Sequence, residues 1–216
     1  MTGKFYYTMG ALLTGAALVA TVVVYPQLPD TVPTHWDIHN EANGYSPKWV
    51  LFVMGPGIMA GILLLMRLLP WLSPKQFEVD SFRATYHQIM LMIVGLMGYV
   101  HGVALWAGSG HTVNIGQAIL GGLCLLWMLM GNVMGKIRRN FFIGIKTPWA
   151  LTNERVWNAT HRFAAKTWVL GGLIGLALIV AGQAFWAPFT VLLTGALAPV
   201  VYSLYFYKQL ERRGEL

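Results

Sequence analysis

The chain has 216 residues, of which 56% are hydrophobic and 11% are charged, and its formal net charge is +7. A soluble domain carries about 25% charged residues, so this chain has too little charge to cover a water-facing surface. The single cysteine, Cys124, excludes an intramolecular disulfide and a metal site built on cysteine pairs. The composition therefore predicts an integral membrane protein.

Six segments are apolar over about 20 residues, the length that an α-helix needs to cross a bilayer. They are residues 5–25, 49–69, 89–107, 115–133, 168–186 and 188–207. The third can be extended back to Ala84, and the last two are so close together that they predict a tight helical hairpin. The sequence thus predicts an all-α polytopic membrane protein with a bundle of about six transmembrane helices.

Lysine and arginine are distributed unevenly over the segments that connect these helices. With the N-terminus placed inside, fourteen of the fifteen lie on inside segments, and only Lys48 lies outside. The positive-inside rule then places both termini in the cytoplasm. This distribution explains the positive charge without a nucleic-acid partner, and it leaves the lipid bilayer as the expected environment.

Two connecting segments are long enough to hold a site, and they divide the chain. Residues 1–70 form a two-helix N-terminal unit around an extracytoplasmic loop at 26–48. Residues 71–216 form a four-helix unit around a cytoplasmic loop at 136–166. Pairs of glycines four residues apart let helix backbones approach closely, and we assign them to packing within the chain, with dimerisation as the alternative. These pairs are Gly57/Gly61, Gly98/Gly102, Gly131/Gly135 and Gly171/Gly175.

The outer loop 26–48 contains four prolines, which predict an extended and stiff segment, and Asn43-Gly44 is a turn signal. Four side chains that can bind a metal alternate along this loop and would share one face of an extended chain. They are His35, Asp37, His39 and Glu41. Imidazole and carboxylate groups suit zinc, so a divalent metal held by His35, His39 and Glu41 is one interpretation, and solvated polar side chains are the other. The sequence requires no cofactor.

His101 lies about two turns from the outer end of the third predicted helix. Ionisable residues inside membrane segments are rare and often functional. A structural hydrogen bond and a functional role are both open for this side chain.

The inner loop 136–166 contains a proline break followed by a helix. Thr147-Pro148 ends any helix that arrives from the N-terminal side, and Thr152 is a candidate N-cap for the next one. That helix is expected to run through His161 into the fifth span, with Trp157 one turn before His161 on the same face.

Glu154 is the only acid among the basic residues of this loop. One interpretation makes it a counter-ion for Arg155, Arg162 or Lys146. The other places it in a polar site with His161 that binds a phosphate-bearing lipid head group or a protein partner.

Segments of both loops carry a recognisable pattern. Residues 140–151 read Asn-Phe-Phe-Ile-Gly-Ile-Lys-Thr-Pro-Trp-Ala-Leu, and residues 156–163 read Val-Trp-Asn-Ala-Thr-His-Arg-Phe. They resemble the C-terminal signature of the SdpI family, which are bacterial membrane immunity proteins. Residues 28–38 with Gly44-Tyr45 and Lys48 are similar to the domain of unknown function that usually precedes that signature. The chain departs from the family pattern at Lys146, where arginine is usual, and at His39-Asn40, where Asn-Gly is usual.

The resemblance implies a bacterial inner-membrane protein that confers immunity to a membrane-active toxic peptide, with a signalling role through the cytoplasmic loop as a further expectation. The expected partners besides the bilayer are a toxic peptide, an anionic lipid and a cytoplasmic regulator. Each loop is expected to hold a binding site. The outer set is His35, Trp36, Asp37, Tyr45 and Lys48. The inner set is Asn140, Gly144, Lys146, Thr147, Pro148, Trp149, Glu154, Trp157, Thr160, His161 and Arg162.

Two other functions stay open. A small transporter or lipid carrier would use broken or polar helix positions, for which Gly55-Pro56-Gly57, Asn132 and Pro199 are the candidates. A metal-dependent membrane hydrolase would use the outer histidines and carboxylates. The sequence contains no established hydrolase motif, so an enzyme is not the preferred interpretation.

Overall fold

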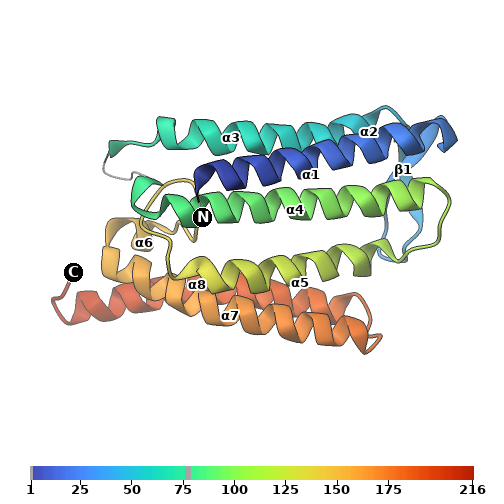
Figure 1. Cartoon of the computed structure of the whole chain (residues 1–216). Helices are drawn as coiled ribbons and strands as arrows, with labels where there is room; N and C mark the ends of the chain where they lie inside the picture. Colours follow the sequence, from blue (N-terminus) through green and yellow to red (C-terminus); the bar gives the residue numbers. More distant parts are fainter. Residues whose placement is uncertain (1, 76–78) are drawn as a thin grey trace. The chain divides into compact units, whose positions relative to one another are not determined.

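The structure is a computed structural model that describes residues 2–75 and 79–216 (Figure 1). Within these residues, six helices are long and apolar enough to cross a membrane, which confirms the predicted all-α polytopic fold. The chain separates into two compact units. We call Met1–Arg67 with Met90–Leu123 the N-terminal unit and Leu68–Ile89 with Cys124–Leu216 the C-terminal unit. These units are defined by packing, and the organisation into 1–70 and 71–216 around the two loops stays a prediction.

The first two membrane segments are α1 (Gly3–Val24) and a longer segment that changes its winding. The longer segment begins as α2 (Val50–Phe52), passes through a π-helical turn (Val53–Gly57) and continues as α3 (Ile58–Leu72). Pro56 lies in the π-helical turn. Proline lacks an N–H group and clashes with the preceding turn, so the helix widens locally at this residue. A small core of Ala17, Met59 and Val94 lies within the N-terminal unit.

The third and fourth membrane segments are α4 (Arg83–Gly108) and α5 (Ile115–Met134). The predicted extension of the third span back to Ala84 is therefore confirmed. Glycine makes close helix contacts in the C-terminal unit, where a Cβ on Gly131 would lie 2.9 Å from the Ala165 carbonyl oxygen. Gly61 and Gly102, by contrast, have open space beside them. The predicted packing role thus holds for some of the glycine pairs and not for others.

The C-terminal unit continues with α6 (Pro148–Thr152), α7 (Glu154–Val180) and α8 (Trp186–Arg212). The prediction that one helix runs through His161 into the fifth span is confirmed. The predicted tight hairpin of the last two spans is confirmed, but its connection is 181–185, so Trp186 belongs to α8 and not to the fifth span. Gly182 ends α7 with a φ of 70°. The apolar residues around this turn hide it from a hydropathy pattern.

The outer loop folds into an antiparallel hairpin of β1 (Thr31–Trp36) and β2 (Ala42–Pro47), in which Val32 faces Ser46. The segment is extended, as predicted, but its two halves also pair with one another. The predicted turn at Asn43-Gly44 is wrong, because both residues lie within β2 and the chain reverses between Trp36 and Ala42. We call residues 31–47 the outer hairpin, which lies at one end of the N-terminal unit (Figure 1).

Candidate functional site

The turn of the outer hairpin is built around Asp37. Its Oδ1 accepts hydrogen bonds from the backbone N–H groups of His39 and Glu41, each at 2.9 Å. Asn40 adopts a left-handed φ of 66°, which asparagine tolerates better than most residues. The shared face predicted for His35, Asp37, His39 and Glu41 does not form, because strict alternation ends where the strand becomes a turn.

Apolar packing and one asparagine anchor the outer hairpin to the helices of its unit. Leu28 and Val32 are buried against Leu51 of α2 and Leu105 of α4. At the tip, Asn40 donates from Nδ2 to the Val113 carbonyl at 2.9 Å and accepts from the Ile115 N–H at 2.7 Å. The second bond satisfies a backbone donor at the start of α5. The hairpin is therefore a fixed part of the N-terminal unit.

Replacing Asn40 with alanine should loosen the outer hairpin by about 1–3 kcal/mol, because two backbone groups lose their partner. Alanine also resists the left-handed conformation. Hydrogen exchange of the 31–47 amides measures the effect. Asn40→Gly is the matched control, since glycine accepts the φ but makes neither bond, and it should recover only part of the protection. Wild-type protection in both variants would contradict the anchoring role.

Asp37 gives the turn a dependence on pH. The Glu41 N–H that donates to its carboxylate is the main cause that lowers the pKa from the ordinary value of 3.8, burial opposes the shift, and the His39 N–H adds to the lowering. A lowered pKa in the folded state stabilises the turn above the unfolded pKa, and this stabilisation is lost as the pH falls through the folded pKa. Exchange of the 31–47 amides should therefore be insensitive to Asp37→Asn well below pH 4 and sensitive to it near neutral pH. An equal effect at both pH values would contradict this role.

Proline occupies both outer edges of the hairpin. The Lys48 N–H donates to the Asp30 carbonyl at 2.9 Å. Because hydrogen-bonded and non-hydrogen-bonded positions alternate in an antiparallel ladder, the nitrogen atoms of Pro33 and Pro47 face away from the partner strand. A proline there costs no internal hydrogen bond and blocks the addition of another strand. A partner of this hairpin would therefore meet its faces and not its edges.

Some residues of the predicted outer set are exposed at the surface of the hairpin. Tyr45 is 63% exposed and lies opposite Pro33 across the ladder. His35 is exposed, and its Nδ1 is 2.5 Å from the Asn43 side-chain oxygen. Trp36 is half-buried at the end of β1. Tyr45 and His35 are therefore available to a ligand at the surface of the hairpin.

Other residues of that set hold the structure together. Lys48 donates from Nζ to the Leu28 carbonyl at 3.1 Å, lies 3.4 Å from an Asp30 carboxylate oxygen and sits 5.0 Å from the centre of the Tyr25 ring. Asp37 uses one carboxylate oxygen in the turn. The contacts of Lys48 and Asp37 therefore stabilise the hairpin and its flanking residues.

A metal site is not assembled by this geometry. Within residues 2–75 and 79–216, no group of three or more His, Cys, Asp or Glu side chains is placed to hold a metal ion. His35 already contacts Asn43, and Glu41 lies beyond the turn. The structure thus gives no geometric support to the divalent metal or to the hydrolase that would depend on it.

His101 is buried in the N-terminal unit and bonded to α1. The Thr21 hydroxyl donates to the Ala17 carbonyl at 2.8 Å, so it accepts from His101 Nε2, also at 2.8 Å. Gly55, in the π-helical turn, makes room for the ring, since a Cβ at this position would overlap it. The structural hydrogen bond considered for His101 is therefore present, and it joins α4 to α1, while Gly55 of the next segment packs against the ring.

Asn140 organises the first part of the inner loop. This fully buried side chain accepts from the N–H groups of Phe142 and Ile143, both at 2.8 Å. Its Nδ2 donates to the carbonyls of Arg138 and Ile143 at 2.8 and 3.0 Å. The amide thus uses both donors and accepts two bonds, which leaves little capacity for a ligand.

Trp157 and His161 form a buried stack beneath the same loop, with ring centres 4.0 Å apart. Trp157 Nε1 donates to the Ile137 carbonyl at 2.8 Å. His161 Nε2 accepts from the Ile145 N–H at 3.0 Å, so Nδ1 carries the proton and donates to the Trp157 carbonyl at 2.8 Å. Gly144 crosses the stack with a φ of 114°, and a Cβ there would overlap His161 Nε2. The predicted pairing of Trp157 and His161 is confirmed, and its observed role is to support the loop.

Thr147 joins α6 to α8. Its hydroxyl accepts from the Ala150 N–H at 3.2 Å as the N-cap of α6 and donates to Ser203 Oγ at 2.9 Å. Pro148 follows at the first helical position, where its missing N–H is harmless. Trp149 is half-buried next to it. Lys146 is exposed, yet its Nζ donates to the carbonyls of Phe141 and Phe142 at 3.0 and 3.3 Å.

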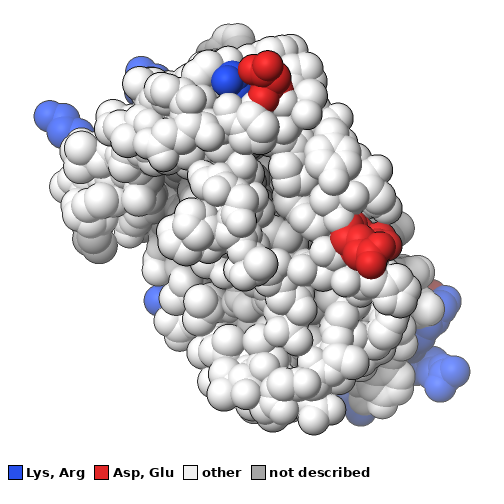
Figure 2. All heavy atoms as spheres, turned by 90° about the vertical axis from the view of Figure 1, so that its right-hand side faces the viewer, with Lys and Arg blue, Asp and Glu red and all other residues white. Residues whose placement is uncertain are grey.

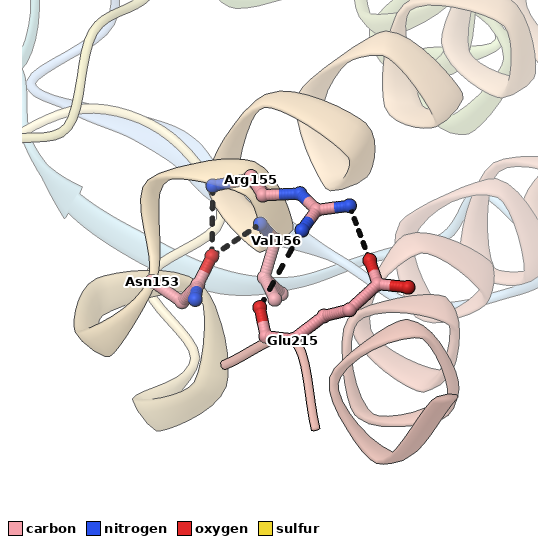
Figure 3. A network of polar contacts seen from close by, with 4 residues as sticks. All are labelled: Asn153, Arg155, Val156 and Glu215. Atoms are coloured by element: carbon pink, nitrogen blue, oxygen red, sulfur yellow. Dashed lines mark hydrogen bonds and ion pairs between the residues drawn. The ribbon is translucent and has the colours of Figure 1, made fainter. Parts of the chain in front are cut away.

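The N-cap of α7 is Asn153 and not Thr152. Asn153 Oδ1 accepts from the N–H groups of Arg155 and Val156 at 2.8 and 3.2 Å (Figure 3). The Thr152 hydroxyl instead donates to the Pro148 carbonyl at 3.0 Å. The prediction fails by one residue because Thr152 is the last residue of α6.

Arg155 takes its counter-ion from the C-terminal end of the chain. Its guanidinium lies 2.8 Å from the Glu215 carboxylate (Figure 3). Glu154 is exposed and forms no ion pair with the residues that the structure describes. The predicted pairing of Glu154 with a basic residue of the loop is therefore not observed. Thr160 is buried, and its hydroxyl has no hydrogen-bond partner within the described residues.

The chain is similar in sequence to known proteins over most of its length. Residues 12–60 match DUF1648, a domain of unknown function, and residues 136–203 match the SdpI/YfhL protein family. The chain is 26% identical over 196 residues to the Immunity protein SdpI of Bacillus subtilis (strain 168), covering 90% of this chain and 92% of that protein. This confirms the resemblance to the SdpI family. The SdpI-like chain is a multi-pass bacterial membrane protein, and no solved structure matches it.

The SdpI-like chain accommodates its departures from the family pattern. At His39-Asn40 the turn forms without glycine, because Asn40 itself takes the left-handed conformation. At Lys146, the ammonium group donates to the neighbouring carbonyls of Phe141 and Phe142.

Sequence reasoning missed several residues that hold the SdpI-like fold together. The turn role of Asn40 could have been predicted from its residue type, since asparagine favours turns. The same is true of Asn153, because it is a good N-cap residue next to the one chosen. Ser203 had no such signal, because a single serine in an apolar helix does not reveal that Thr147 is its partner.

Proposed function

We propose that this SdpI-like chain protects the bacterial membrane that contains it against a membrane-active toxic peptide. The proposal rests on the match to a protein named for immunity, which is 26% identical to this chain over 90% of the chain's length. The two family models cover the sequence of the outer hairpin, within residues 12–60, and most of the inner loop, within residues 136–203, which supports the proposal for both parts of the chain.

The outer hairpin is the best candidate for the recognition surface. It is anchored by apolar packing and by Asn40, so a ligand would not have to order it. Tyr45 and Ile38 are 63% and 60% exposed. His35 lies opposite Gly44, the neighbour of Tyr45, in the ladder, and it precedes Ile38 by three residues. Figure 2 shows that this end of the molecule is largely uncharged, with small groups of acidic side chains and little Lys or Arg. Exposed apolar groups near acidic ones suit a peptide that is apolar and weakly cationic.

The inner set is a weaker candidate for peptide recognition. Asn140, Thr147, Trp157 and His161 are buried, and their hydrogen bonds are made within the loop or to α8. A loss of function on mutation at these positions would report a damaged loop and not a lost ligand contact.

A survival assay tests the proposal. Cells that produce the chain are exposed to a secreted, membrane-depolarising peptide, and survival and membrane potential are recorded at equal membrane levels of each variant. The double variant His35→Ala/Tyr45→Ala should lower survival about tenfold or more, since exposed aromatic anchors dominate most interfaces. Tyr205→Ala is the matched control, because Tyr205 is 62% exposed on α8 and should be silent.

The possible outcomes test the recognition surface and the immunity function separately. Protection by the wild type that persists in the double variant would contradict the hairpin as the recognition surface. No protection by the wild type at full expression would contradict immunity. The transporter or lipid carrier would then be tested by substrate flux in liposomes. A signalling role through loop 136–166 would show as a reporter response that needs this loop and leaves survival unchanged.

A further inference from the structure

The basic residues of loop 136–166 fall into two groups. Those in the first group make contacts within the chain: Arg139 donates to the Leu151 carbonyl at 3.1 Å, Lys146 donates to two carbonyls, and Arg155 pairs with Glu215. The side chains of the second group are exposed, and they make no hydrogen bond or ion pair with the part of the chain that the structure describes. The second group is Lys136, Arg138, Arg162 and Lys166. We call it the basic cluster.

One face of α7 extends the basic cluster into the membrane. Arg162, Lys166, Leu170 and Ile174 follow each other at intervals of four residues, and all are exposed. Residues at this spacing lie on neighbouring parts of one helix face. Leu170 and Ile174 are 58% and 51% exposed. The face is therefore cationic at its loop end and apolar over the next two turns.

The end of α5 brings the other cations to this face. Gly135 lies against Arg162, since a Cβ on Gly135 would be 3.8 Å from Arg162 Cγ. Ile137 is buried, and its carbonyl is held by Trp157 Nε1. Lys136 and Arg138, on either side of this anchor, are exposed, and they follow Gly135, which lies against Arg162 at the cationic end of the face. Trp157, through its hydrogen bond to Ile137, thus holds the backbone between Lys136 and Arg138 in place.

We propose that the basic cluster binds the head-group phosphate of an anionic phospholipid in the leaflet next to loop 136–166. The exposed face of α7 has the same order as a phospholipid, with charge at the interface and apolar surface deeper in the membrane. Juxtamembrane basic residues attract anionic lipids, and arginine holds phosphate in a two-pronged geometry. A cytoplasmic protein would contact the charges alone, whereas a phospholipid can contact both the charges and the adjoining apolar surface. This lipid site goes beyond the proposed immunity function and depends on neither a toxin nor the outer hairpin.

Native mass spectrometry of the full chain in detergent tests the lipid site. The probes are phosphatidylglycerol, phosphatidylcholine and inorganic phosphate, each titrated separately. The wild type should bind phosphatidylglycerol in preference to phosphatidylcholine. The double variant Arg162→Gln/Lys166→Gln should weaken phosphatidylglycerol binding about 30-fold, since each lost charge costs about one kcal/mol near an anionic surface. Lys136→Gln/Arg138→Gln should weaken binding in the same direction while leaving α7 unaltered.

A matched control shows whether a loss of phosphatidylglycerol binding is specific to the basic cluster. Arg212→Gln/Arg213→Gln removes the same charge from exposed residues at the end of α8, so an equal loss there would reduce the effect to net charge and overturn the site. Unchanged phosphatidylglycerol binding in both cluster variants would also overturn it, and would leave the cluster to a cytoplasmic protein. Inorganic phosphate that binds as well as the lipid would show that the apolar face contributes nothing. Circular dichroism of each variant establishes that it is folded, and Lys136→Gln/Arg138→Gln decides the question if the α7 variant is not.

Discussion

Replacing His161 with alanine should lower the free energy of unfolding of the C-terminal unit by about 3–5 kcal/mol. The substitution removes the ring that stacks on Trp157, and it leaves the buried Ile145 N–H without an acceptor. Equilibrium unfolding in detergent micelles, followed by circular dichroism, measures the change. Loop 137–145 should also exchange its amide hydrogens faster, because it rests on this stack.

Two neighbouring substitutions distinguish this effect from a general sensitivity of α7. His161→Gln keeps a side-chain oxygen that can accept from the Ile145 N–H, so it should recover part of the lost stability. Arg162→Ala removes an exposed side chain one residue away and should change stability by about 0.5 kcal/mol or less. If His161→Ala proved as mild as Arg162→Ala, the supporting role of the stack would be disproved.

Replacing Gly172 with alanine should separate α5 from α7 and destabilise their packing by about 1–3 kcal/mol. A Cβ on Gly172 would lie 2.5 Å from the Cys124 carbonyl oxygen and 2.7 Å from Met128 Cγ. Since the first of these contacts is with backbone, a rotamer change cannot relieve it and the helices must move. Thermal unfolding in micelles should show a lower midpoint.

Gly121→Ala in α5 is the control for this substitution, because a Cβ on Gly121 would meet no atom within 4 Å and alanine is the better helix former. Its unfolding midpoint should stay level or rise. A similar loss in both variants would mean that glycine content, and not close packing at Gly172, governs stability.

The signature of the inner loop has a physical explanation in these contacts. Asn140 closes the first turn, Gly144 passes over the His161 ring, and Thr147 joins α6 to α8. The result is a rigid loop that presents the basic cluster. Experiments on function are therefore best directed at exposed residues such as Tyr45 and Arg162, since changes at buried signature residues alter the fold first.

The amino-acid sequence alone determined the membrane class, the number of spans and where the two long loops lie along the chain, because the apolar length of each segment is a local property. The motif residues also identified the SdpI resemblance. Strand pairing, the turn at Asp37 and the anchoring of Asn40 to Val113 and Ile115 were decided only by the tertiary structure. The same holds for the division between buried and displayed residues in each predicted set. The physical reason is that a polar side chain is a support or a ligand contact according to the partners that folding brings to it, and those partners lie far away in the sequence.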